Sequence, residues 1–126
     1  MAADEFVLSG SYATTPLSGD ISLAPSFVAP IDERVTLTNK LYQEYSLDSD
    51  MPVSVAFGGL TSANVVILKA AGGKVRARIT SADGSAQAVP FDSYWLLMSL
   101  ATPVTALDLT RTPATPITVQ VFLGEI

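Results

Sequence analysis

Short runs in which apolar and polar residues alternate dominate this chain, and they constrain its fold more than any other feature. Val75, Ala77 and Ile79, for example, alternate with two arginines. An amphipathic helix needs apolar residues at every third or fourth position, whereas a period of two places them on one face of a strand. Such runs recur at roughly ten-residue spacing, separated by glycine, proline and aspartate. The sequence therefore predicts an all-β protein, an antiparallel β-sandwich or jelly roll of about 8–10 strands.

Most of the chain can be divided into segments with this strand pattern. They are residues 5–14, 21–28, 34–47, 52–57, 63–71, 74–81, 94–100, 104–110 and 117–123, with 89–92 as the end of a further strand. A short helix over residues 39–45 is an alternative, because that run tolerates helix best. The run 94–100, which contains the only tryptophan, is expected to be a buried strand. In the segment 104–110, Val104 and Ala106 are expected to point inward, together with either Leu107 or Leu109.

Two glycine-containing pairs are expected to form tight turns. Gly72-Gly73 fits a two-residue hairpin of the primed type, in which both residues take positive φ. Asp83-Gly84 is the next tight-turn signal. A hairpin at the first pair would gather basic residues on one outward face, either for an acidic partner surface or as a solvated strand face. These candidate partner-binding residues are Lys69, Lys74, Arg76 and Arg78.

The N-terminal segment contains prolines that limit how it can join a sheet. Pro25 and Pro30 lie around the apolar segment 21–28. Because proline donates no ladder hydrogen bond, we expect an edge strand or an extended arm that embraces a neighbouring subunit. The chain is accordingly divided into an arm or edge strand at 1–32 and a β-sandwich domain at 33–126. The arm's candidate partner-binding residues are Phe6, Tyr12, Ile21, Leu23 and Phe27.

Composition argues against several classes of function. The 126 residues include no cysteine and no histidine, so we expect no zinc site, no Ser-His-Asp triad and no disulfide. The net charge of −5 argues against non-specific nucleic-acid binding, which requires a positive surface. A membrane helix is not expected, since no window of about 18 uncharged apolar residues is present. A chain that is 48% hydrophobic and 15% charged suits a protein packed against its own copies or a partner.

Two sets of residues could still bind a ligand. Asp48 and Asp50, with Asp92 or Asp83 from other loops, could hold a hard cation, but their spacing matches no calcium loop and we expect solvated carboxylates. Aromatic residues could form a sugar-binding platform, or they could be divided between the core and the sheet faces. These aromatic residues are Tyr42, Tyr45, Tyr94, Trp95 and Phe122. Neither set forms a catalytic motif, so no enzymatic activity and no cofactor are expected.

Between residues 53 and 125, the succession of short strand-like segments is similar to that in a known class of proteins. The segments are ANVVIL at 63–68, ITSADG at 79–84, VPFD at 89–92, TPVTAL at 102–107 and VQVFLGE at 119–125. In the succession of these segments, the chain resembles small all-β virion structural proteins of tailed bacteriophages. These are head decoration (cement) proteins and related tail or fibre-attachment modules.

The resemblance implies a non-enzymatic protein with a jelly-roll-like fold, present in many copies on the exterior of a capsid. It would be made in the host cytoplasm, form a homo-dimer or homo-trimer, and bind the major capsid protein, bridging and stabilising neighbouring capsid subunits. No nucleic acid, membrane or cofactor is expected as a partner. The alternative is a carbohydrate-binding β-sandwich module, either in a phage tail or fibre or as a free protein.

Overall fold

The computed structural model describes residues 4–14, 27–112 and 115–126, with side chains from residue 5 to 8 and from 34 onward. Every regular element in these ranges is a strand, so the predicted all-β class is confirmed. The strands are β1 (Asp4–Thr14), β2 (Phe27–Leu37), β3 (Asn39–Leu47), β4 (Val53–Ser54), β5 (Val65–Ala71), β6 (Val75–Ser81), β7 (Ala86–Phe91), β8 (Tyr94–Met98), β9 (Val104–Arg111) and β10 (Ile117–Glu125). A helix long and apolar enough to cross a membrane is absent from the described ranges.

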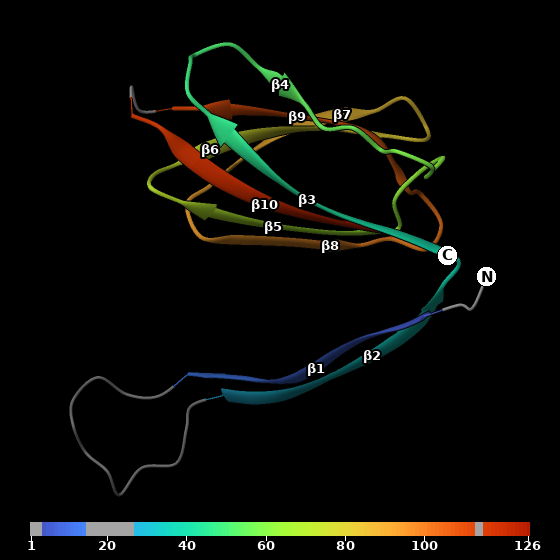
Figure 1. The fold of residues 1–126 in the computed structure, drawn as a ribbon. Helices are drawn as coiled ribbons and strands as arrows, with labels where there is room; N and C mark the ends of the chain where they lie inside the picture. Colours follow the sequence, from blue (N-terminus) through green and yellow to red (C-terminus); the bar gives the residue numbers. More distant parts are fainter. Residues whose placement is uncertain (1–3, 15–26, 113–114) are drawn as a thin grey trace, which may run out of the picture.

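Two antiparallel four-stranded sheets pack face to face, as Figure 1 shows. The first, here called the β3–β8 sheet, has the strand order β3-β10-β5-β8, and the second, the β4–β7 sheet, has the order β4-β9-β6-β7. Their pairing is nested: β3 pairs with β10, β4 with β9, β5 with β8, and β6 with β7. This nested connectivity of eight strands in two sheets is that of a jelly roll. The predicted sandwich architecture is therefore confirmed.

The core lies between the sheets and is built from the inward side of each strand. In β10 the alternate residues Ile117, Val119, Val121 and Leu123 are buried, as the period of two predicts. The central strand β5 is more continuously apolar, because its outer face is also covered at Val65, which is 1% exposed. The buried set includes Leu47, Val66, Leu68, Val75, Ala77, Phe91, Val104, Leu107 and Leu109.

The pair Gly72-Gly73 does not form the expected hairpin. It joins β5 to β6, and these strands belong to different sheets, so the chain crosses the sandwich at this point. Gly72 has a φ of 107°, whereas Gly73 is not among the residues with positive φ. By contrast, Asp83-Gly84 does turn the chain between the paired strands β6 and β7, with Gly84 at a φ of 88°.

Three expected strands have different limits or surroundings. The segment 34–47 is interrupted at Thr38, whose backbone N–H donates to the Glu125 carbonyl (2.8 Å), so it supplies β2 and β3 and no helix. The segment 52–57 supplies only the two residues of β4. The run 94–100 is not a buried strand: β8 lies at the edge of its sheet and leaves Tyr94 and Leu96 exposed, and Leu100, which follows β8, is exposed as well.

The alternation in β9 changes parity because of a bulge. The register opposite β6 shifts between Thr80 and Ser81, so that Thr80 faces Ala106 while Ser81 faces Val104. The extra residue returns Val104 to the inner side, where it is fully buried beside Leu107 and Leu109. Ala106 is exposed, so the expectation that it points inward was wrong.

Strands β1 and β2 form a separate antiparallel hairpin, with pairs from Asp4↔Leu37 to Thr14↔Phe27. Among the described strands they pair only with each other, so β1 and β2 are not edge strands of either sheet. In Figure 1 the hairpin leaves the sandwich near the C-terminus and continues as a separate two-stranded ribbon. The predicted strand 5–14 is confirmed, whereas the segment 21–28 falls mostly outside the described residues.

Candidate binding surfaces

The base of the hairpin is fixed to the outer face of the β3–β8 sheet. Phe6 of β1 stacks on Phe122 of β10, with ring centroids 5.8 Å apart and planes 23° apart. Leu37, at the end of β2, is 3% exposed and lies against Gly124. Glu5 and Arg34 form an exposed ion pair at 3.0 Å across the two strands. The hairpin therefore has an apolar attachment at its base, and the strands continue from there without pairing to the described sandwich strands.

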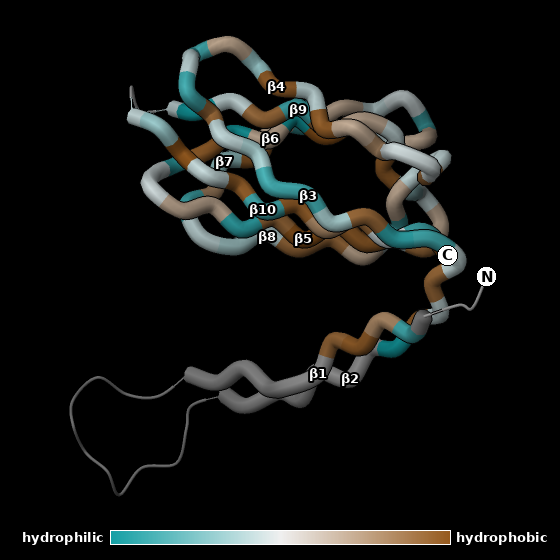
Figure 2. Tube along the Cα trace, viewed as in Figure 1, coloured by the Kyte–Doolittle hydropathy of each residue, from teal (hydrophilic) through white to brown (hydrophobic). Residues whose placement is uncertain are grey.

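An apolar row crosses the same outer face from edge to edge. The register places Tyr42 of β3 beside Phe122, Phe122 beside Ile67 of β5, and Ile67 beside Leu96 of β8. We call these four residues the aromatic–aliphatic row. At its two ends Tyr42 is 61% and Leu96 is 43% exposed. Figure 2 shows the hydrophobic character of β5 and of the coloured part of β1 in brown.

A shallow hollow adjoins the aromatic–aliphatic row. Tyr94 lies on the same face, 59% exposed, with the Lys69 Nζ 5.5 Å from its ring centroid. With Gln120, these two residues line the hollow beside Tyr42, Ile67 and Phe122. A partner that covered this face would remove several large apolar side chains from water at once.

The sequence-predicted arm residues are only partly accounted for. Phe6 contacts Phe122, so in the isolated chain its ring serves to hold the hairpin. Tyr12 and Phe27 face Ala29 and Thr14 in the register of the hairpin, but their side chains lie outside the described part of the structure. Ile21 and Leu23 also lie outside the described residues.

The four basic candidates do not form the single face that was predicted. Lys69 lies on the outer face of the β3–β8 sheet, beside the buried Leu68 and Ala70. Arg76 and Arg78 alternate with buried residues on β6 and therefore lie on the outer face of the other sheet. Lys74 belongs to the link between the sheets. The reason is the crossover at Gly72-Gly73, which places β5 and β6 on opposite sides of the core.

The aromatic residues do not form one platform either. Tyr42, Tyr94 and Phe122 share the outer face, whereas Tyr45 and Trp95 pack against the core from the inner side. The Tyr45 hydroxyl donates to the Gln43 side-chain oxygen and accepts from the Ala56 N–H at 3.0 Å. Tyr45 thus fastens the segment after β4 to β3.

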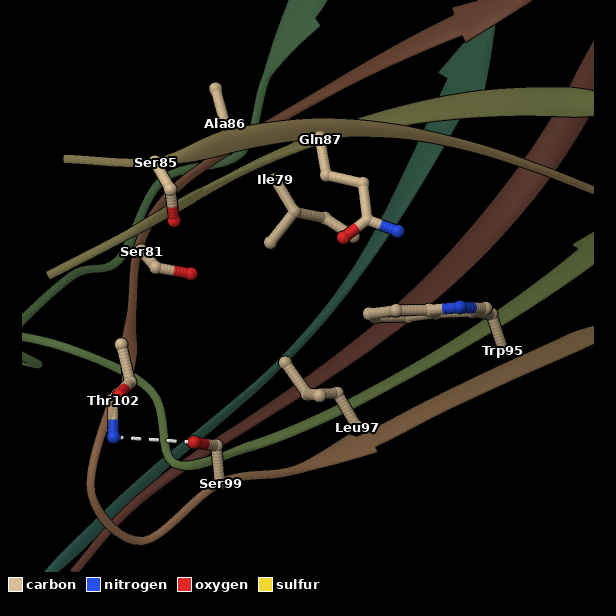
Figure 3. A pocket seen from close by; sticks show the side chains of 9 residues that line it. All are labelled: Ile79, Ser81, Ser85, Ala86, Gln87, Trp95, Leu97, Ser99 and Thr102. Carbon is tan, nitrogen blue, oxygen red and sulfur yellow. Dashed lines mark hydrogen bonds between the residues drawn. The ribbon is translucent and has the colours of Figure 1, made fainter. Parts of the chain in front are cut away.

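A pocket that the sequence did not predict opens between the edge strands β7 and β8 (Figure 3). Its volume is about 260 Å³. Trp95 and Leu97 enter it from β8, and Gln87 enters it from β7. The remaining lining residues are Ile79, Ser81, Ser85, Ala86, Ser99 and Thr102. A signal was present in the sequence, because Ser81 and Gln87 are polar residues at positions whose parity points inward.

Two of the loop carboxylates, Asp50 and Asp83, make contacts within the chain. Asp50 pairs with the Nε of Arg111 at 3.1 Å, and the guanidinium side chain is only 10% exposed. Asp83 accepts from the Ser85 hydroxyl (2.6 Å) and N–H (2.9 Å), and these hydrogen bonds, the hydroxyl first, lower the pKa of Asp83. Within the described ranges, no three carboxylates gather as they would around a metal ion.

Two further polar residues hold loops in place. Glu125 accepts from the N–H groups of Thr61 (3.1 Å) and Ser62 (3.0 Å). Asn64 is 7% exposed, donates to the Ser99 carbonyl (3.0 Å) and accepts from the Ile126 N–H (3.1 Å). Such satisfied buried amides are structural, since both polar ends already have partners.

Comparison with known proteins identifies no relative of this chain. No protein-family model matches the chain, and neither a curated protein nor a solved structure is significantly similar to it.

Proposed function

We propose that this protein is a non-enzymatic structural protein of a bacteriophage virion, a decoration or cement protein that binds the capsid exterior and bridges neighbouring capsid subunits. The observation that carries the proposal is the β1–β2 hairpin, whose eleven-residue strands pair only with each other in the described structure. An isolated two-stranded hairpin is at best marginally stable in water, so strands of this length are expected to gain a partner surface. The resemblance of residues 53–125 to cement proteins supports the capsid as that partner.

Bridging requires two attachment regions on one stiff body. The hairpin is one region, and its base is fixed by Phe6 on Phe122 and by Leu37 on Gly124. The exposed ends of the aromatic–aliphatic row, Tyr42 and Leu96, belong to the second. Once one region binds a capsid subunit, the other is held at high effective concentration near the next subunit. Separating the two subunits then requires breaking one of these attachments, which stabilises the particle.

Copies of the protein would contact one another through the same surfaces. Each copy in a homo-dimer or homo-trimer would add attachment regions, and the assembly would bind more tightly than a single copy. The low charged fraction of 15% favours such packing among neighbours. Sedimentation velocity of the purified protein, alone and with capsids, tests this part of the proposal.

The test of function is co-sedimentation with expanded phage capsids that lack the protein. The informative variant replaces residues 8–33 with Asn-Gly, which closes a two-residue turn between the paired residues Val7 and Arg34. This variant keeps Phe6 and Leu37, and therefore the attachment of the hairpin base. We expect saturable binding of the full chain and clearly weaker binding of the short variant, at equal thermal stability of the sandwich.

Two results would change the proposal. Equal binding by both chains would keep the cement function but move the capsid contact to the sandwich. Absence of binding by the full chain to capsids would refute the cement function and direct attention to tail or fibre assemblies.

A further inference from the structure

The pocket between β7 and β8 has the features of a ligand site that is separate from the surfaces described for capsid binding. It lies at the open side of the sandwich, where the edge strands of the two sheets are not bonded to each other. Figure 3 shows the flat Trp95 ring on one side of the pocket, with the Gln87 amide on the opposite side. The Ser81 and Ser85 hydroxyls point into the same space from a third direction.

The polar residues in this pocket break the pattern of their strands. On β6 the inward positions are Val75, Ala77 and Ile79, and the next inward position is Ser81. On β7 the residue opposite Ile79 is Gln87, on the same side as the buried Phe91. Apolar residues at these two positions would extend the core, but Ser81 is half-buried and Gln87 is exposed at the rim, so folding requires neither an apolar nor a polar residue there. Departures from local patterning of this kind are expected where a site serves function.

Several polar groups of the lining are available to a ligand. The Gln87 amide, the Ser81 and Thr102 hydroxyls and the Trp95 indole N–H make no hydrogen bond with the described residues. By contrast, Ser85 Oγ donates to Asp83 at 2.6 Å, and Ser99 Oγ accepts from the Thr102 N–H at 3.2 Å. An amide and a hydroxyl together offer both donors and acceptors, which a ligand with hydroxyl groups can use.

The lining chemistry selects the class of ligand. None of the described lining residues is charged, so a phosphate, carboxylate or ammonium group would find no counter-charge. A wholly apolar ligand would leave the Gln87 amide and Ser81 hydroxyl buried without partners, which disfavours it. The indole of Trp95 offers a flat apolar face for a ring. A volume of about 260 Å³ lies below the roughly 300–1,000 Å³ of sites for drug-sized molecules, so one ring is the appropriate size.

We propose that this pocket binds one neutral sugar ring, such as the terminal unit of a glycan. The apolar face of the sugar would lie on Trp95, and its hydroxyl groups would bond to Gln87 and Ser81. This inference goes beyond the proposed cement function and does not rest on it, because the pocket lies apart from the hairpin base and from the outer aromatic–aliphatic row.

The experiment uses the only tryptophan of the chain as its reporter. Trp95 fluorescence of the full-length protein is titrated with methyl glycosides of glucose, galactose, mannose and N-acetylglucosamine, and with glycerol and sodium phosphate as comparisons. We expect a saturable change with at least one glycoside and none with glycerol or phosphate. Absence of a saturable change with all four glycosides would refute the proposal.

Variants then locate the binding. Gln87→Ala removes an exposed side chain, and its loss should raise the dissociation constant about twofold to tenfold, as for one neutral hydrogen bond. Gln120→Ala is the matched control, because Gln120 lies on the outer face of the other sheet. Glycoside binding that is unchanged in a Ser81→Ala, Gln87→Ala double variant would overturn the assignment of the site. The capsid assay is independent of these titrations, so either proposal can fail without the other.

Discussion

Leu37 covers Gly124 so closely that a Cβ built on Gly124 would lie 2.9 Å from Leu37 Cδ1 and 3.1 Å from Cδ2. This contact joins the last residue of β2 to the penultimate residue of β10, and it explains why glycine occupies a position where the strand pattern would accept a side chain. Gly124 is not among the residues with positive φ, so the requirement is one of space rather than backbone conformation. The junction between hairpin and sandwich therefore depends on the missing side chain.

Gly124→Ala is expected to destabilise this junction. Both methyl groups of Leu37 must move to admit the new Cβ, and overpacking of this kind costs about 1–3 kcal/mol. Urea denaturation measures the loss, and hydrogen exchange should show the earliest opening near Leu37. Gly59→Ala is the control, because its Cβ would meet only Asn39 Nδ2 at an ordinary 3.5 Å. Equal stability of the two variants would contradict the close packing described here.

The stacked rings of Phe6 and Phe122 should be energetically coupled. A double-mutant cycle with Phe6→Leu and Phe122→Leu is expected to give a coupling free energy of about 0.5–1.5 kcal/mol, typical of an aromatic pair. Denaturant unfolding of the four proteins provides the values. Additive effects would show that the two rings do not stabilise the hairpin base through their mutual contact.

The loss of folding stability on removing a leucine side chain should depend on whether the leucine lies on the inner strand β5 or on the edge strand β8. Leu68 of β5 is 0% exposed in the centre of the core, and Leu68→Ala should cost about 2–5 kcal/mol. Leu96 of the edge strand β8 is 43% exposed, and Leu96→Ala should cost clearly less. Thermal unfolding of both variants tests the placement of β8 at a sheet edge. Similar losses in the two proteins would mean that β8 is covered.

The pKa of Asp83, and with it the contribution of Asp83 to the pH dependence of folding stability, should depend on Ser85. The Ser85 hydroxyl and N–H stabilise the charged carboxylate, so the folded-state pKa of Asp83 lies below its unfolded value. Its contribution to stability is then present above the unfolded pKa and is lost as the pH falls through the folded one. Ser85→Ala should raise the pKa of Asp83, measured by NMR titration of the carboxyl carbon, while Ser85→Thr retains the hydroxyl. An unchanged pKa in Ser85→Ala would exclude the hydroxyl as the cause.

The period of two predicted the strands well because it records which side of a strand is buried. β6 illustrates this from Val75 to Ile79, and β10 does so from Ile117 to Leu123, before the buried Gly124. The pattern was insufficient in β9, where one bulge residue reverses the parity between Val104 and Leu107. Such a bulge depends on pairing with β6 and leaves no local mark in the sequence.

The connectivity of the strands and the pocket were not predicted either, and the reasons are again physical. Gly72-Gly73 permits a reversal of the chain, but it does not determine which sheet the next strand joins. That choice depends on distant partners, such as Leu68 with Trp95 and with Val121. A hairpin at Gly72-Gly73 would place the basic residues on one face, whereas the crossover puts β5 and β6 in different sheets and leaves the edge strands β7 and β8 unpaired with each other.

The nested pairing also favours one order of strand assembly over others. β6 and β7 are joined by a short turn and can pair as soon as both exist, and each later pair encloses the one before it. Closing the inner pairs first shortens the effective loop that the next pair must close, which lowers its entropic cost. The outermost pair unites Asn39–Leu47 with Ile117–Glu125, so β3 has no sandwich partner until β10 has been synthesised. On the ribosome, β3 would therefore remain unpaired until β10 emerges, although β10 lies between β3 and β5 in the finished sheet.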